Sequence, residues 1–148
     1  MTIELTVYLA GQIHDDWREQ IRDLARQRNL PLQFVGPQED HDLSDDIGEN
    51  IKGKQPNNIF KDAAASEFNN LRTTILMQKA DVVIALFGDK YRQWNTAMDA
   101  ATALATGKPL ILVRHPDLHH ALKEIAQKSH VVVDNIEQAL DALAYVLR

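Results

Sequence analysis

The segment Asp81-Val82-Val83-Ile84-Ala85-Leu86 carries five apolar residues in a row, and it decides the fold class. A strand that is buried on both faces has such a run, as the strands of parallel sheets do. Leu110 to Val113 repeats the pattern directly after Pro109. Because a helix-length segment separates the two runs, they predict a β-α-β unit with parallel strands.

The rest of the chain continues this alternation of strand and helix periods. Further strands are expected over residues 3–9, 32–35 and 131–133, and helices over 16–29, 68–79, 95–106, 118–126 and 136–147. We therefore predict a doubly wound α/β fold, flavodoxin-like or Rossmann-like. Its five-stranded parallel sheet has the order 2-1-3-4-5 and is covered by helices on both faces. Residues 1–148 are expected to form a single domain.

Residues 36–60 interrupt the alternation. The segment contains Gly36-Pro37, six acidic residues between Glu39 and Glu49, and Pro56-Asn57-Asn58. A connection of this length in a compact domain usually serves a function. We expect it to be a polar lid over the site.

Composition excludes several classes of protein. The chain has 148 residues, of which 45% are hydrophobic and 25% charged, so it is globular rather than disordered. A net charge of −5 without a basic cluster argues against binding a nucleic-acid polymer. There is no cysteine, and the longest apolar run, Val82 to Phe87, is too short to cross a membrane. The first residues lack the features of a signal peptide, so a soluble, cytoplasmic protein is expected.

The predicted topology locates a binding site before any residue is considered. Open parallel sheets bind ligands beyond the carboxyl ends of their strands, where the strand order reverses. Asp99, one turn into the helix expected from Asn95, would lie there, and Tyr8 near the end of the first strand would reach the same crevice. Asp99 is either a charge favoured by the helix start or a nucleophile toward an electrophilic carbon. Tyr8 is either a site residue or a packed strand tyrosine.

Other signals are weaker. Trp94 can stack on a planar base or pack against its helix, and His14 can contact a ligand. No metal is expected, because the acids from Glu39 to Glu49 lack calcium-loop spacing and Pro116 separates the histidines around it. No cofactor is expected either. The loops contain no dinucleotide fingerprint, no phosphate-binding loop and no serine nucleophile elbow.

Two segments together resemble a known family. They are Tyr8-Leu9-Ala10-Gly11, and a longer block from Ala80-Asp81 through Trp94-Asn95-Thr96-Ala97-Met98-Asp99 to Thr106-Gly107-Lys108-Pro109. This pattern resembles the nucleoside 2-deoxyribosyltransferase superfamily, and most closely its short YtoQ-like branch.

The resemblance implies cleavage of the N-glycosidic bond of nucleosides. Asp99 would be the nucleophile, Tyr8 would hold its carboxylate, and Gly11 would let the backbone approach the substrate. The loops that face this crevice supply the further substrate-binding residues that we expect, namely Gln12, His14, Gly88, Asp89, Trp94 and Asn95.

The chain also departs from the family pattern. The family nucleophile is typically Glu, one methylene longer than Asp99, and two other acids of the family fall near Thr73 and at Gln93, close to Asp89.

The predicted function is therefore deoxyribosyl transfer or nucleoside hydrolysis through a carboxylate nucleophile. The alternative is a non-catalytic nucleoside- or nucleotide-binding module on the same fold. A third reading is an interaction domain that uses the helix from Asn95 as an oligomer face. The expected partners are a small-molecule nucleoside and further copies of the chain, as a homodimer or higher homo-oligomer.

Overall fold

The computed structural model describes residues 3–88 and 93–148 and contains a five-stranded parallel sheet. The strand order is β2-β1-β3-β4-β5. The strands are β1 (Leu5–Ala10), β2 (Leu32–Val35), β3 (Val82–Phe87), β4 (Leu110–Arg114) and β5 (Val131–Val133). Every neighbouring pair is parallel. The predicted fold class and strand order are confirmed.

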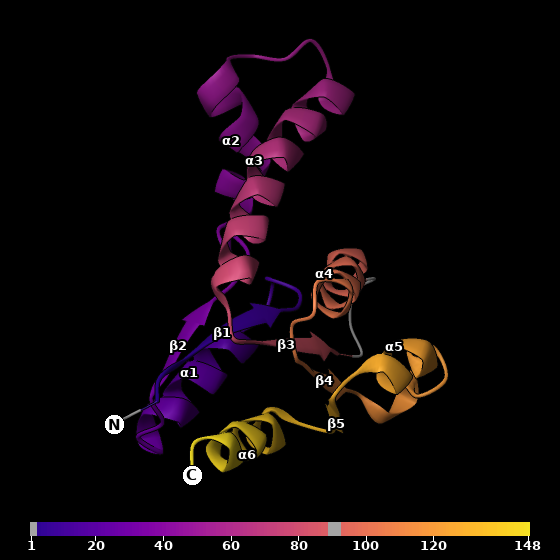
Figure 1. Ribbon diagram of the computed structural model, residues 1–148. Helices are drawn as coiled ribbons and strands as arrows, with labels where there is room; N and C mark the ends of the chain where they lie inside the picture. The colour runs from indigo at the N-terminus through magenta and orange to yellow at the C-terminus, as the bar shows by residue number, and fades with distance from the viewer. Residues whose placement is uncertain (1–2, 89–92) are drawn as a thin grey trace.

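Helices cover both faces of the sheet (Figure 1). Helices α1 (Trp17–Gln27) and α6 (Ile136–Val146) bury their apolar stripes on one face, against Val7, Leu9 and Ile84. Helix α4 (Trp94–Ala105) packs on the opposite face, together with Met77 at the end of α3 (Asn58–Lys79) and Leu122 just before α5 (Lys123–Lys128). Each strand contributes side chains to the apolar cores on both faces of the sheet, because successive side chains along a strand point to opposite faces.

Residues 36–60 form much of a two-helix arm, and the expectation of an irregular connection there is wrong. Helix α2 (His41–Lys52) packs against α3, which begins at Asn58 and ends at Lys79, where the helix through Phe68 was expected to end. Figure 1 shows the two helices projecting from the sheet, with the α2–α3 connection at the far end.

Polar caps and ion pairs add to the apolar spacing of Leu43, Ile47 and Ile51 in stabilising the arm helices. Asp40 caps α2 by accepting the Leu43 N–H at 3.1 Å, and Asn57 caps α3 by accepting the Phe60 N–H at 3.1 Å. The acids of α2 face lysines of the arm: Lys61 lies 3.1 Å from the Asp46 carboxylate. The acidic run therefore belongs to a helix surface.

A glycine sets the distance between the two arm helices. Gly48 is buried, and a Cβ atom at this position would lie 2.4 Å from the backbone nitrogen of Ala65. Backbone atoms cannot yield as a flexible side chain can. The close crossing of α2 and α3 therefore requires glycine here.

The starts of three helices differ from the expected ranges. Asp16 does occupy the N-cap position of α1, but its carboxylate accepts from the Gln20 side chain (2.8 Å) rather than from a backbone N–H. Helix α4 begins at Trp94, so Asn95 lies within its first turn and caps nothing. The helix expected over 118–126 is instead a 3₁₀ turn (Pro116–Leu118) followed by α5, because Pro116 starts a separate turn.

Within the described ranges, no helix combines the length and the hydrophobicity needed to cross a membrane.

Gly48→Ala should destabilise the protein although alanine is the better helix former. The added methyl meets Ala65 backbone at the 2.4 Å noted above, and we expect a loss of about 1–3 kcal/mol in the free energy of unfolding by urea titration. Asn50→Ala, on the exposed side of the same helix, is the control and should not lose stability. A Gly48→Ala protein as stable as its parent would show that the crossing tolerates a wider separation.

Candidate functional site

A cavity of about 500 Å³ lies beyond the carboxyl ends of β1 and β3. Five described parts of the chain line it: the β1–α1 loop from Gly11, Pro37 and Gln38 after β2, the first turns of α2, the middle of α3, and residues 93–99 at the start of α4. These segments lie where the strand order reverses, which is the position the topology predicts. Asp99 is part of the wall.

Asp99 lies in a small polar cluster that three elements form together. Its side chain is only 7% exposed. The hydroxyl of Tyr8, from β1, donates to Oγ1 of Thr73 on α3 at 3.5 Å, and it lies near enough to the Asp99 carboxylate to stabilise the charge of that group. Tyr8 itself is fully buried, so it reaches the cavity through the carboxylate rather than directly.

Burial shifts the pKa values of both groups. Loss of solvation raises the pKa of Asp99 from 3.8 to about 6, while the Tyr8 hydroxyl and the positive charge of Arg18 act against that rise. Burial, and then the neighbouring Asp99 charge, raise the pKa of Tyr8 to about 12. At neutral pH the cluster therefore contains an ionised carboxylate and a neutral phenol that can donate to it.

Arg18 supplies a buried positive charge behind the cluster. The residue is 2% exposed, and its guanidinium is bound by carbonyl groups: those of Gln12 (2.7 Å), Gly11 (2.8 Å) and Leu9 (3.0 Å). Burial lowers the pKa of Arg18 to about 10, which leaves it charged at neutral pH.

A second cavity of about 490 Å³ lies on the other side of Asp99, between α3 and α4. It shares Asn70, Thr73, Met98 and Asp99 with the first cavity and extends along the two helices as far as Thr106 and Lys108. The carboxylate therefore stands where two spaces meet.

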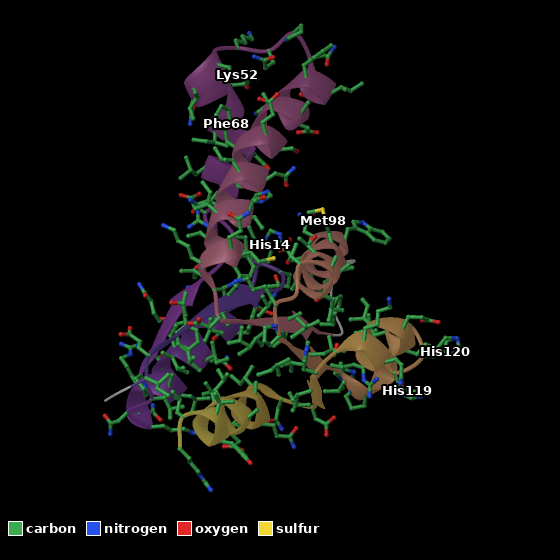
Figure 2. All side chains as sticks on the ribbon, in the orientation of Figure 1. His14, Lys52, Phe68, Met98, His119 and His120 are labelled. Atoms are coloured by element: carbon green, nitrogen blue, oxygen red, sulfur yellow. The ribbon has the colours of Figure 1, made fainter. Side chains whose placement is uncertain are left out.

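Most of the predicted binding residues border the first cavity. Gln12, His14, Trp94 and Asn95 line it, and the Trp94 side chain is 74% exposed. Figure 2 shows His14, from the loop after β1, and Met98 of α4 at the base of the arm, whereas His119 and His120 lie away from it beside α5. Gly88 does not line the cavity. Its N–H and carbonyl are bound by the side chain of Gln93. Asp89 lies outside the described residues.

Gly11 lines the cavity too, but the structure gives a different reason for its small size. A Cβ atom at Gly11 would lie 2.5 Å from the indole ring of Trp17. The glycine therefore lets Trp17 pack beneath the loop. The Trp17 indole N–H also donates to the Gln12 carbonyl at 3.1 Å.

A family model described as nucleoside 2-deoxyribosyltransferase YtoQ matches residues 8–147. The chain belongs to this family. Within it, the protein YtoQ of Bacillus subtilis (strain 168), described as uncharacterized, is 56% identical over 144 residues, which is 97% of each chain.

Two solved structures of lower identity share the fold of this YtoQ family member. One is the 2-deoxyribosyltransferase of Bacillus psychrosaccharolyticus, which is 15% identical with a TM-score of 0.56 and covers 90% of this chain and 89% of its own. The other is a conserved protein from Enterococcus faecalis V583, which is 20% identical with a TM-score of 0.63 and covers 98% and 100%. At these identities the likeness establishes the architecture.

The sequence pattern missed two parts of the site. Arg18 falls on the same face of α1 as Ile21 and Ala25, and this position on an apolar stripe was the available signal of its burial. The arm residues had no such signal. His41, at the start of α2, borders the cavity and packs edge-on against His14, with ring centroids 5.2 Å apart.

The raised pKa of Asp99 predicts that Asp99→Asn stabilises the protein at neutral and alkaline pH. The folded protein binds a proton that the unfolded chain releases between about pH 4 and pH 6, so stability falls as pH rises through that window. Asparagine does not titrate, so Asp99→Asn avoids this loss. Its free energy of unfolding should exceed that of the parent by about 2–3 kcal/mol at pH 8, and the difference should vanish near pH 4.

Urea unfolding of parent and variant at both pH values measures the effect. Asp62→Asn, an exposed carboxylate on the wall of the same cavity, is the control and should change little at either pH. Parallel stability curves for the parent and Asp99→Asn would contradict the assigned burial cost.

Proposed function

We propose that this protein cleaves the N-glycosidic bond of nucleosides with Asp99 as the nucleophile and passes the pentosyl group to a second base or to water. The observation that carries the proposal is the Asp99 carboxylate, buried at the junction of two cavities and held by Tyr8. Membership of the nucleoside 2-deoxyribosyltransferase YtoQ family supports the same reaction class.

The reaction proceeds in two displacements. A carboxylate oxygen of Asp99 forms a bond to the anomeric carbon as the carbon–nitrogen bond breaks, and the electron pair of that bond leaves with the base. The base then gains a proton. In the second step a nitrogen of another base, or a water oxygen, attacks the anomeric carbon, frees the carboxylate and loses its own proton. Two inversions give overall retention, as in retaining glycosidases.

The electrostatics suit this role. With a pKa of about 6, Asp99 is ionised at neutral pH but is only weakly solvated, which favours its reaction with an electron-poor carbon. The Tyr8 hydroxyl orients one oxygen of the carboxylate and stays protonated. A simple binding module needs no such group, because burying a charge destabilises the fold without a gain in affinity for a neutral ligand.

Asp99→Asn should abolish base release, because an amide cannot form the sugar ester. We expect a loss of about a thousandfold or more, measured by chromatography of mixed 2′-deoxynucleosides. Tyr8→Phe should lose about ten- to a hundredfold, since it removes an orienting hydrogen bond and leaves the nucleophile. Intact mass spectrometry should find a deoxypentosyl adduct on the parent and none on Asp99→Asn.

Asp141→Asn, which changes a carboxylate paired with Arg28 on the far side of the sheet, is the control for these assays and should keep full turnover. Nucleoside binding by calorimetry without base release from any nucleoside would instead identify the parent as a non-catalytic binding module. Full turnover by Asp99→Asn would exclude Asp99 as the nucleophile.

We also propose that the protein forms at least a homodimer. Large apolar side chains are exposed along the arm and beside the cavities: Ile59 is 80% exposed and Leu71 57%, with Ile75 one turn further along α3. Met98, on α4, is half exposed at the mouth of both cavities. A second copy of the chain that packs there would cover this surface and exclude water from Asp99.

Light scattering at micromolar concentration should give at least twice the 16.7 kDa of one chain. Replacing Leu71 and Ile75 together by Glu should reduce the mass to that of a monomer, because four buried charges would face each other in a dimer. Val146→Glu, an exposed apolar residue of α6, is the matched control and should keep the parent mass. A monomeric parent would refute the proposal.

A further inference from the structure

The β1–α1 loop is bound on one side by the guanidinium of Arg18. Nη1 donates to the Gln12 carbonyl, and Nη2 donates to the carbonyls of Gly11 and Leu9. Arg18 does not line the cavity, whereas Gly11, Gln12 and Ile13 do. The loop therefore separates the buried cation from the cavity.

Peptide geometry fixes what the loop presents on its other side. The described peptide bonds contain no cis bond, so each N–H points opposite to the carbonyl of the same peptide unit. Because the Gly11 and Gln12 carbonyls face Arg18, the N–H groups of Gln12 and Ile13 face away from it, toward the cavity that these residues line.

These donors have no acceptor within the described part of the chain. Neither the Gln12 nor the Ile13 N–H takes part in a backbone or side-chain hydrogen bond there. The Gln12 side chain is not such a donor, because its Nε2 is shielded from the cavity and its Oε1 accepts the His14 N–H. Two adjacent unpaired N–H groups on one cavity wall can together bind an acceptor from outside the chain.

We propose that the N–H groups of Gln12 and Ile13 bind the exocyclic oxygen of the nucleoside base and stabilise the charge it gains as the glycosidic bond breaks. This inference rests on the proposed function. The electron pair of the broken bond enters the base, and part of its charge resides on that oxygen. Donors already directed at this position need no rearrangement, so their effect is greater in the transition state than on the bound substrate.

The charges around the cavity favour a neutral base oxygen over a phosphate. Asp45, Asp62 and Asp99 all line the cavity, and their negative charges oppose a dianionic group. A base oxygen is neutral on binding and becomes negative only as the bond breaks. The loop donors begin no more than about 13 Å along the strand from Tyr8, so one nucleoside can reach both the donors and Asp99.

Arg18 is then a positioning residue. Its three hydrogen bonds hold the two carbonyls turned away from the cavity, and its charge, lying behind the loop, adds to the positive potential of the N–H groups. Without it the carbonyls are free to rotate toward the cavity, and the donors would turn away.

The test compares 2′-deoxyinosine with 2′-deoxyadenosine, which differ at C6 of the base by an oxygen and an amino group. Arg18→Met should lower the ratio of kcat for deoxyinosine to kcat for deoxyadenosine by about tenfold or more, with KM little changed. Any effect of the substitution on Asp99 or on the folded fraction changes kcat for both substrates equally, so it cancels in the ratio. Arg22→Met, at an arginine that pairs with Glu39, is the matched control and should leave the ratio unchanged.

Ile13→Pro tests the donor directly, because proline has no N–H, and it serves if Arg18→Met fails to fold. Ile13→Ala keeps the N–H and loses the side chain, so the ratio between these two variants isolates the donor. We expect the ratio of kcat for deoxyinosine to kcat for deoxyadenosine to be about tenfold lower in Ile13→Pro than in Ile13→Ala.

Equal losses on both nucleosides would overturn the proposal and leave the loop a structural element. Loss of affinity for nucleoside 5′-monophosphates alone would assign the donors to phosphate. If the parent releases base from neither nucleoside, the proposed function fails separately, and calorimetry with free hypoxanthine and adenine decides the inference. A preference for hypoxanthine that Ile13→Pro removes would support the oxygen site, and equal affinities would overturn it.

Discussion

The parallel pairing of β1 with β3 is the constraint on which the rest of the site depends. The register places Tyr8 opposite Val83 and Leu9 opposite Ile84. Since side chains alternate between faces, Tyr8 points toward α4 and Leu9 toward α1. A slip of one residue would exchange these faces and remove the phenol from the carboxylate. The pairing of these buried strands thus fixes the position of Tyr8 beside Asp99.

The site is built from two buried charges that are stabilised in different ways. Three backbone carbonyls accept from the Nη atoms of Arg18, which orders the loop after β1, whereas its Nε is buried without a partner and burial lowers its pKa to about 10. Asp99 has the Tyr8 hydroxyl and the more distant charge of Arg18, and its pKa remains raised. A structural carboxylate would be expected to have its pKa lowered by close partners. An incompletely stabilised carboxylate at a cavity wall is instead characteristic of a reactive group.

The parts predicted from sequence are those that a buried sheet dictates. Strand positions, strand order and the location of the crevice follow from apolar runs such as 82–87, because a parallel strand must be hydrophobic on both faces. Helix α2 could not be predicted in this way. Its signals are the Asp40 cap, the pairs with Lys61, the Gly48 contact and the four-residue spacing of Leu43, Ile47 and Ile51, none of which is a continuous apolar run. The apolar stripe of α1 indicated that Arg18 is buried, but the carbonyl groups that accept from it, those of Leu9, Gly11 and Gln12, could not be read from the pattern.

The departures from the family's acids are consistent with one another. Thr73 places a neutral hydroxyl 3.5 Å from the Tyr8 oxygen, at the position where the resemblance leads one to expect an acid. A second carboxylate so close to the Tyr8–Asp99 pair would raise the pKa of one of the two acids further, because like charges resist joint ionisation. Asp99 already carries a large desolvation effect. With Thr73 beside it, the Asp99 carboxylate stays ionised at neutral pH, and in the proposed reaction the sugar would have to approach α4 more closely than a glutamate would require.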